Sequence, residues 1–144
     1  MWHVFVLMDI KKITEDSLIN LTDHLHHIVS TLQATAECFR VKGAEEANKN
    51  YLVCIEAIQL FDELIEGIGR LLNLDFSKVS INGETIQNRK ERLLKLTSEM
   101  HSAQIGQDWV MLADLMEYEL TPLIQDWIKI IPPFHEEIKS AYNS

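Results

Sequence analysis

Three carboxylates and a tyrosine lie close together in the stretch ADLMEYEL, residues 113–120. The acids are Asp114, Glu117 and Glu119, and carboxylates at helical spacing can transfer protons or bind a divalent cation. They can equally form the solvated face of a helix that packs by its other side. At about 100° per residue, Asp114 and Glu117 point away from the apolar positions of the stretch. The pattern therefore predicts solvated side chains for these two acids.

Glu119 differs from the other two acids because it flanks the apolar positions, in one column with Asp108 and Asp126. A half-buried carboxylate needs a cation or hydrogen-bond donors. Arg89 occupies the matching edge of the preceding predicted helix, so we expect an Arg89–Glu119 ion pair that sets the register of the two helices. A catalytic Glu119 is the alternative interpretation.

Histidines gather in the stretch DHLHH, residues 23–27. His24 and His27 are three residues apart on one helical face and could supply two metal ligands. Di-iron bundles of the ferritin type require Glu-x-x-His on two helices, and this motif does not occur in the sequence. We therefore expect a solvated histidine cluster that packs partly against a neighbouring helix. A metal-binding bundle or metal-dependent hydrolase that uses His24, His27 and helix carboxylates is the alternative.

The stretch DELIE places Glu63 and Glu66 at the Glu-x-x-Glu spacing with which all-helical nucleoside-triphosphate pyrophosphatases hold magnesium. The next comparable pair is Asp114-x-x-Glu117, too far along the chain for that pattern. The sequence also lacks a P-loop, a dinucleotide-binding glycine pattern, a Gly-x-Ser-x-Gly motif and a zinc-type cysteine pair. We therefore predict no catalytic residue and no cofactor.

Composition limits the class of protein and its partners. The chain has 144 residues, 47% of them hydrophobic, with three prolines and five glycines, which favours one domain built from long helices. Its net charge of −9 disfavours nucleic acid and anionic membranes as partners. Two cysteines, Cys38 and Cys54, make no disulfide framework, and reduced thiols are typical of the cytoplasm.

The periodicity of apolar residues predicts an all-α fold, an antiparallel bundle of four main helices. The helices are expected at about 15–42, 44–73, 84–103 and 108–131, within about three residues at each end. The second carries the clearest apolar stripe, and the stripe of the third includes Arg89. The second stripe comprises Ala47, Tyr51, Cys54, Ile58, Phe61, Ile65, Ile68 and Leu72, and the third comprises Ile86, Arg89, Leu93, Leu96, Met100 and Ala103.

The connecting and terminal segments complete a single domain over residues 1–144. Residues 74–83 form the main loop, more extended than stranded, because a lone strand has no partner. Pro122 is expected to kink a continuous fourth helix, whereas Pro132 and Pro133 are expected to end it before a short helix or tail over 132–144. The apolar residues 1–13 are too short for a membrane span and lack the features of a signal peptide. We interpret them as an attachment that packs on the body or is exchanged between subunits.

The order of elements resembles the flagellar export chaperone FliS of bacteria, a small antiparallel helical bundle that binds the C-terminal segment of flagellin. The resemblance rests on VKGAEEANKNYLVCIEAIQLFDELIEGIGRLLNLD and on QDWVMLADLMEYELTPLIQDW, and it covers roughly residues 18–131. FliS has an N-terminal region rich in Tyr, Asn and Pro, where this chain has MWHVFVLMDIKKITED. The resemblance implies a bundle that binds protein, and it carries over neither flagellin nor any binding residue.

The sequence thus favours a non-enzymatic, chaperone-like bundle that packs a partner helix, or a second copy of itself as in a homodimer, in an apolar groove. Aromatic residues can anchor such an interface, with a plain core role as the alternative. The candidate anchors are Trp2, Phe5, Trp109, Trp127 and Phe134. Trp2 lies on no predicted stripe and is the strongest of them.

Overall fold

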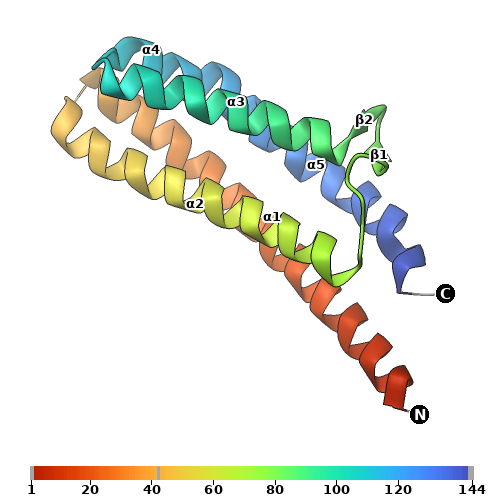
Figure 1. Ribbon diagram of the computed structural model, residues 1–144. Helices are drawn as coiled ribbons and strands as arrows, with labels where there is room; N and C mark the ends of the chain where they lie inside the picture. The colour runs from red at the N-terminus through yellow and green to blue at the C-terminus, as the bar shows by residue number, and fades with distance from the viewer. Residues whose placement is uncertain (1, 42, 143–144) are drawn as a thin grey trace.

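The computed structural model describes residues 2–41 and 43–142, with side chains from Asp9 onward, and it is almost entirely helical. In these residues, five α-helices, two further helical turns and a two-stranded hairpin follow one another (Figure 1). They are α1 (Trp2–Val41), α2 (Ala44–Leu71), β1 (Ser80–Ile81), β2 (Glu84–Thr85), α3 (Ile86–Ile105), α4 (Trp109–Asp114), the π-helical turn η1 (Leu115–Leu120), α5 (Thr121–Ile138) and the final turn η2 (Lys139–Ala141). The predicted all-α bundle of four main helices is confirmed, because α4, η1 and α5 form one continuous run.

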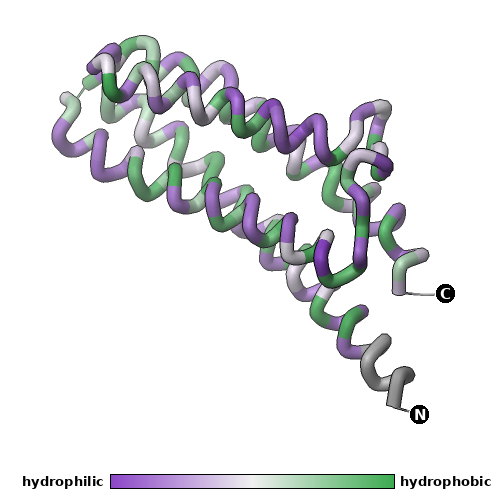
Figure 2. Tube along the Cα trace, viewed as in Figure 1, coloured by the Kyte–Doolittle hydropathy of each residue, from purple (hydrophilic) through white to green (hydrophobic). Residues whose placement is uncertain are grey.

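Apolar residues that recur every three to four positions explain why these segments are helices. Figure 2 shows hydrophobic and hydrophilic residues alternating along them, and the hydrophobic ones meet in a single core. Every member of the predicted stripes of α2 and α3 is buried. Gly43, with φ of 94°, separates α1 from α2, a backbone conformation that a residue with a Cβ adopts at a cost.

The first helix is longer than predicted. Residues 1–13 were expected to form a separate attachment, but α1 begins at Trp2 and continues without a break. The expected capping residues near Thr14 therefore lie inside the helix, where the Thr14 hydroxyl donates to the Ile10 carbonyl at 2.8 Å. The wrong start arose because a capping sequence permits a helix to begin but does not require it.

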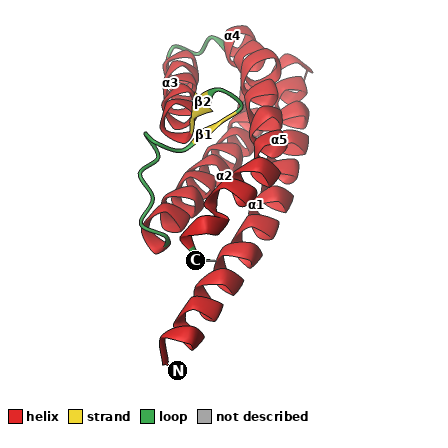
Figure 3. Cartoon of the chain, turned by 90° about the vertical axis from the view of Figure 1, so that its right-hand side faces the viewer, coloured by secondary structure: helices red, strands yellow, loops and turns green. Residues whose placement is uncertain are grey.

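The main loop contains a small hairpin instead of an extended segment alone. Ser80 pairs with Thr85 and Ile81 with Glu84, and Asn82 and Gly83 make the turn with positive φ values of 52° and 84°. Two consecutive positive φ values are typical of the turns that join adjacent antiparallel strands. Figure 3 shows the hairpin between α3 and α5, where it gives β1 the partner that the sequence did not reveal.

Pro122 is accommodated within the fourth helical run, as predicted. A proline cannot donate the usual main-chain hydrogen bond, and the run widens into the π-helical turn η1 immediately before it. The Thr121 hydroxyl, which is buried, donates to the Met116 carbonyl at 2.8 Å and supports this wider turn.

Pro132 and Pro133 do not end the helix, so that prediction is wrong: α5 continues to Ile138. A proline inside a helix costs roughly 3 kcal/mol. Phe134 and Ile138, both fully buried, lie beyond the prolines. Each buried side chain of this size contributes about 1.5–3 kcal/mol, so packing of this end against the core offsets the local cost.

Candidate functional site

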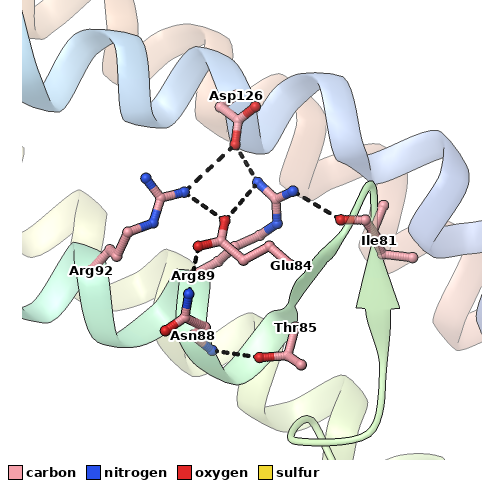
Figure 4. Close-up of polar contacts among 7 residues, drawn as sticks. All are labelled: Ile81, Glu84, Thr85, Asn88, Arg89, Arg92 and Asp126. Carbon is pink, nitrogen blue, oxygen red and sulfur yellow. Dashed lines mark hydrogen bonds and ion pairs between the residues drawn. The ribbon is translucent and has the colours of Figure 1, made fainter.

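Arg89 on α3, itself buried, is the centre of a polar cluster whose other members are partly exposed (Figure 4). Its guanidinium donates to the Asp126 carboxylate on α5 and to the main-chain carbonyl of Ile81 at 3.0 Å. An oxygen of Glu84 lies 3.5 Å from the Arg89 guanidinium and 2.7 Å from that of Arg92. Two carboxylates and two guanidiniums thus neutralise one another, which fastens α3 and the hairpin to α5.

The predicted Arg89–Glu119 ion pair is wrong, because Arg89 pairs with Asp126 and Glu119 is exposed on η1. Residues equally distant from the loop of an antiparallel helical hairpin lie at the same height. Counted from Gln107, Arg89 comes 18 residues before, Asp126 19 after and Glu119 only 12 after. The angular position around each helix correctly placed Arg89 toward the fourth helical run. The number of residues from the connecting loop, which sets the height along the helix, was also needed to identify its partner.

The acids of the 113–120 stretch bind the last turn of α1. Arg40 donates to the Asp114 carboxylate at 2.9 Å and also to that of Glu117, and its guanidinium carbon lies 5.8 Å from the centre of the Tyr118 ring. These bonds, from Asp114 first and Glu117 second, raise the pKa of Arg40. The two acids are partly solvated, as predicted, and they also join α1 to the fourth helical run.

The histidine cluster is divided between a helix contact and solvent. The Nε2 atom of His24 lies 2.8 Å from the Ala57 carbonyl, so this ring joins α1 to α2, while His27 is exposed. Within the described residues, no three His, Cys, Asp or Glu side chains are placed to hold a metal ion. Among these residues, no cluster of metal-ligating side chains supports the metal-binding alternative.

Two of the aromatic candidates are core residues. Trp127 and Phe134 are fully buried, and the Trp127 ring meets Phe61 edge-on with 4.9 Å between centroids. They are inaccessible to a partner, which corrects their proposed role as interface anchors. Trp109 is half-buried and stacks on Phe39 at 5.5 Å. The side chains of the remaining candidates, Trp2 and Phe5, lie outside the described residues.

A groove of about 640 Å³ separates α2 from α3. It exists because α2 packs chiefly on α1, whereas α3 packs chiefly on α4 and η1. Ile55, Ile58 and Leu93 provide an apolar floor, and Leu94 stands at the edge with 71% of its surface exposed. Seven of its eleven lining residues are polar or charged, so the groove combines an apolar floor with polar walls, a character that suits an amphipathic helix.

Lys90 closes one end of this groove. Its ammonium pairs with Asp62 at 3.4 Å and with Glu66, both on α2, and lies 5.6 Å from the centre of the Phe76 ring. In the described part of the chain, these are the only ion pairs that join α2 to α3. The two helices are therefore joined by ion pairs at the end near the hairpin, and the rest of the groove has no such link among the described residues.

The surface of α2 is also more apolar than a single core stripe requires. Leu52, Val53 and Leu60 lie off the stripe and are about half exposed, at 57%, 53% and 46%. Val53 and Leu60 line a separate pocket against α1, so they do not belong to the groove. A core stripe alone does not reveal exposed apolar residues such as these and Leu94.

Comparison with protein families gives one match, to a domain of unknown function, DUF8042, over residues 16–130. The chain belongs to the DUF8042 family. No curated protein and no solved structure matches the chain. The DUF8042 region, residues 16–130, contains the whole groove and the Arg89 cluster. Trp2 and Phe5 precede this region, and Phe134 follows it.

None of the described helices combines the length and the apolar character that a membrane span requires.

Proposed function

We propose that this DUF8042 protein is a non-enzymatic, chaperone-like bundle that binds an amphipathic helix in the groove between α2 and α3. The helix belongs to another protein or to a second copy of the chain. The observation that carries the proposal is a groove with an apolar floor, polar walls and the exposed Leu94 at its edge. Burial of apolar surface in such a groove is the main driving force for helix binding.

The charged clusters support a binding protein over an enzyme. Six acids are paired with Arg40, Arg89, Arg92 or Lys90, so their charges serve contacts between elements of the fold: Asp62, Glu66, Glu84, Asp114, Glu117 and Asp126. Resemblance of the element order to FliS supports a chaperone-like role. Two free, buried cysteines and a net charge of −9 fit a cytoplasmic protein that does not bind nucleic acid.

Site-specific photocrosslinking tests the groove. A photoreactive residue replaces Leu94, and a matched control carries it at Ile19, an apolar residue of α1 that is similarly exposed and outside the groove. In cells that make the protein, we expect a discrete product from position 94 and none from position 19. Mass spectrometry of that product should locate an amphipathic helix. Equal products from both positions, or none from position 94, would contradict the proposal.

A further inference from the structure

The open part of the groove carries unpaired negative charge. Lys90 is neutralised by Asp62 and Glu66, whereas Glu63 and Glu91 line the groove without a basic partner among the described residues. Glu91 accepts only an amide hydrogen bond from Gln87, at 3.2 Å. A helix that fills the groove is therefore expected to bring positive charge to these two acids.

The two acids face each other near one end of the groove. α2 and α3 are antiparallel, and Lys90 lies opposite Asp62 and Glu66, so the residue numbers of facing positions sum to about 154. Glu63 and Glu91 fulfil this relation and stand at the same height. Leu94, Ile55 and Thr97 lie further toward the opposite end, which is the more apolar one. The ligand should therefore be apolar at one end and basic at the other.

The N-terminal segment of this chain, residues 2–13, has that composition and a suitable length. It reads WHVFVLMDIKKI, with the apolar residues first and the adjacent Lys11 and Lys12 near its end. It is helical, and at 1.5 Å per residue it extends about 18 Å. The groove-lining ranges 55–63 and 87–97 extend about 13 and 16 Å at the same rise.

The last turns of this segment are largely exposed. Asp9, Lys11, Lys12 and Ile13 are exposed, Ile13 by 52% of its surface, whereas Ile10 packs partly buried against the core of its own chain. Because α1 is continuous from Trp2 to Val41, the segment cannot fold back into its own groove without breaking the helix. A second copy can receive it while α1 stays intact.

We propose that residues 2–13 of one copy occupy the α2–α3 groove of a second copy, with Lys11 and Lys12 against Glu63 and Glu91. The apolar residues of the segment then cover the exposed Leu94 and the partly buried Ile55. This inference rests on the proposed function of the groove and names the helix that it binds. Reciprocal exchange between two copies gives a closed dimer.

Charge exchange tests the pairing in the full-length chain. Variant X is K11E/K12E and variant Y is E63K/E91K, while D23K/E37K on α1 repeats the charge change of Y at exposed positions outside the groove. Sedimentation equilibrium measures the dimer dissociation constant, and circular dichroism verifies folding. X alone and Y alone should dimerise at least about tenfold more weakly than the native chain, because each brings like charges together. D23K/E37K should dimerise like the native chain.

An equimolar mixture of X and Y should recover the native dissociation constant, because both contacts then join opposite charges. The variant F5D should be monomeric, since it places a charge on the apolar floor. A native chain that is monomeric at every concentration, or a mixture no tighter than its components, would overturn the inference. In that case a Leu94 crosslink to another protein would still support the proposed function, whereas loss of any groove crosslink would remove both.

Discussion

Replacing Asp126 with Asn should destabilise the fold more than replacing Glu119 with Gln. Both changes remove one negative charge from the same helical run. Only Asp126 accepts a hydrogen bond from the buried Arg89 guanidinium. Glu119 is exposed and has no hydrogen-bond or ion-pair partner among the described residues.

The magnitude follows from the surroundings of the pair. A hydrogen bond between charged groups contributes about 1.5–3 kcal/mol. The Asp126 side chain is 44% exposed, and Glu84 remains 3.5 Å from Arg89 after the change. Solvent screening and this second carboxylate reduce the expected loss to about 1–2 kcal/mol. Exposed Glu119 lacks such a contact, so E119Q should change stability by less than about 0.5 kcal/mol.

Urea denaturation at pH 7 gives the free energy of unfolding for the native chain, D126N and E119Q. Comparison with R89M and R89M/D126N then measures the coupling between the two residues. We expect a coupling energy between Arg89 and Asp126 that differs from zero. The dependence of the unfolding free energy on urea concentration should be equal in all variants, because all should expose the same surface on unfolding. A loss in E119Q as large as that in D126N, or a coupling energy near zero, would refute the argument that height along the hairpin selects the partner.

Three further changes test other parts of the fold by the same denaturation assay. G69A should lower the free energy of unfolding by about 1–3 kcal/mol, because its Cβ would lie 2.7 Å from the Phe76 ring. G67A should raise it by about 0.5–1 kcal/mol, because Gly67 occupies an open helical position. T121V should lower the free energy of unfolding by about 1 kcal/mol, because it removes the hydroxyl hydrogen bond that supports the π-helical turn. Unchanged stability would show that the hydrogen bond does not support the turn. Burial raises the pKa of Cys54, so the folded chain keeps the thiol proton to a higher pH than the unfolded chain. Stability should therefore fall as the pH rises above about 8.5, and C54A should fall less.

The sequence predicted which faces of the helices are buried with few errors. All eight stripe residues of α2 and all six of α3, including the polar Arg89, are buried. This succeeds because an amphipathic period fixes the side of a helix that faces the core. It does not fix where a helix ends: Phe134 and Ile138 extend α5 beyond two prolines through contacts that a local pattern does not contain.

The sequence predicted a groove between helices but not which two helices flank it. An apolar groove between helices was expected, but a stripe does not show which pair of neighbouring helices packs less closely. That depends on the contacts of α2 with α1 and of α3 with α4, which involve residues distant in sequence. The candidate anchors Trp127 and Phe134 failed for the same reason, because a large aromatic residue on a stripe fills the core before it can serve an interface.

The position of Lys90 has a consequence for the range of helices that the groove can accept. Its ion pairs with Asp62 and Glu66 join α2 to α3 at the end of the groove near the hairpin, and no further ion pair joins these helices among the described residues. For the helix that we propose as ligand, the Lys90 end of the groove therefore has charges that are already paired, whereas Glu63 and Glu91 next to it are available to a basic side chain. The proposed binding should accordingly depend more on the position of the ligand's positive charges than on the size of its apolar side chains.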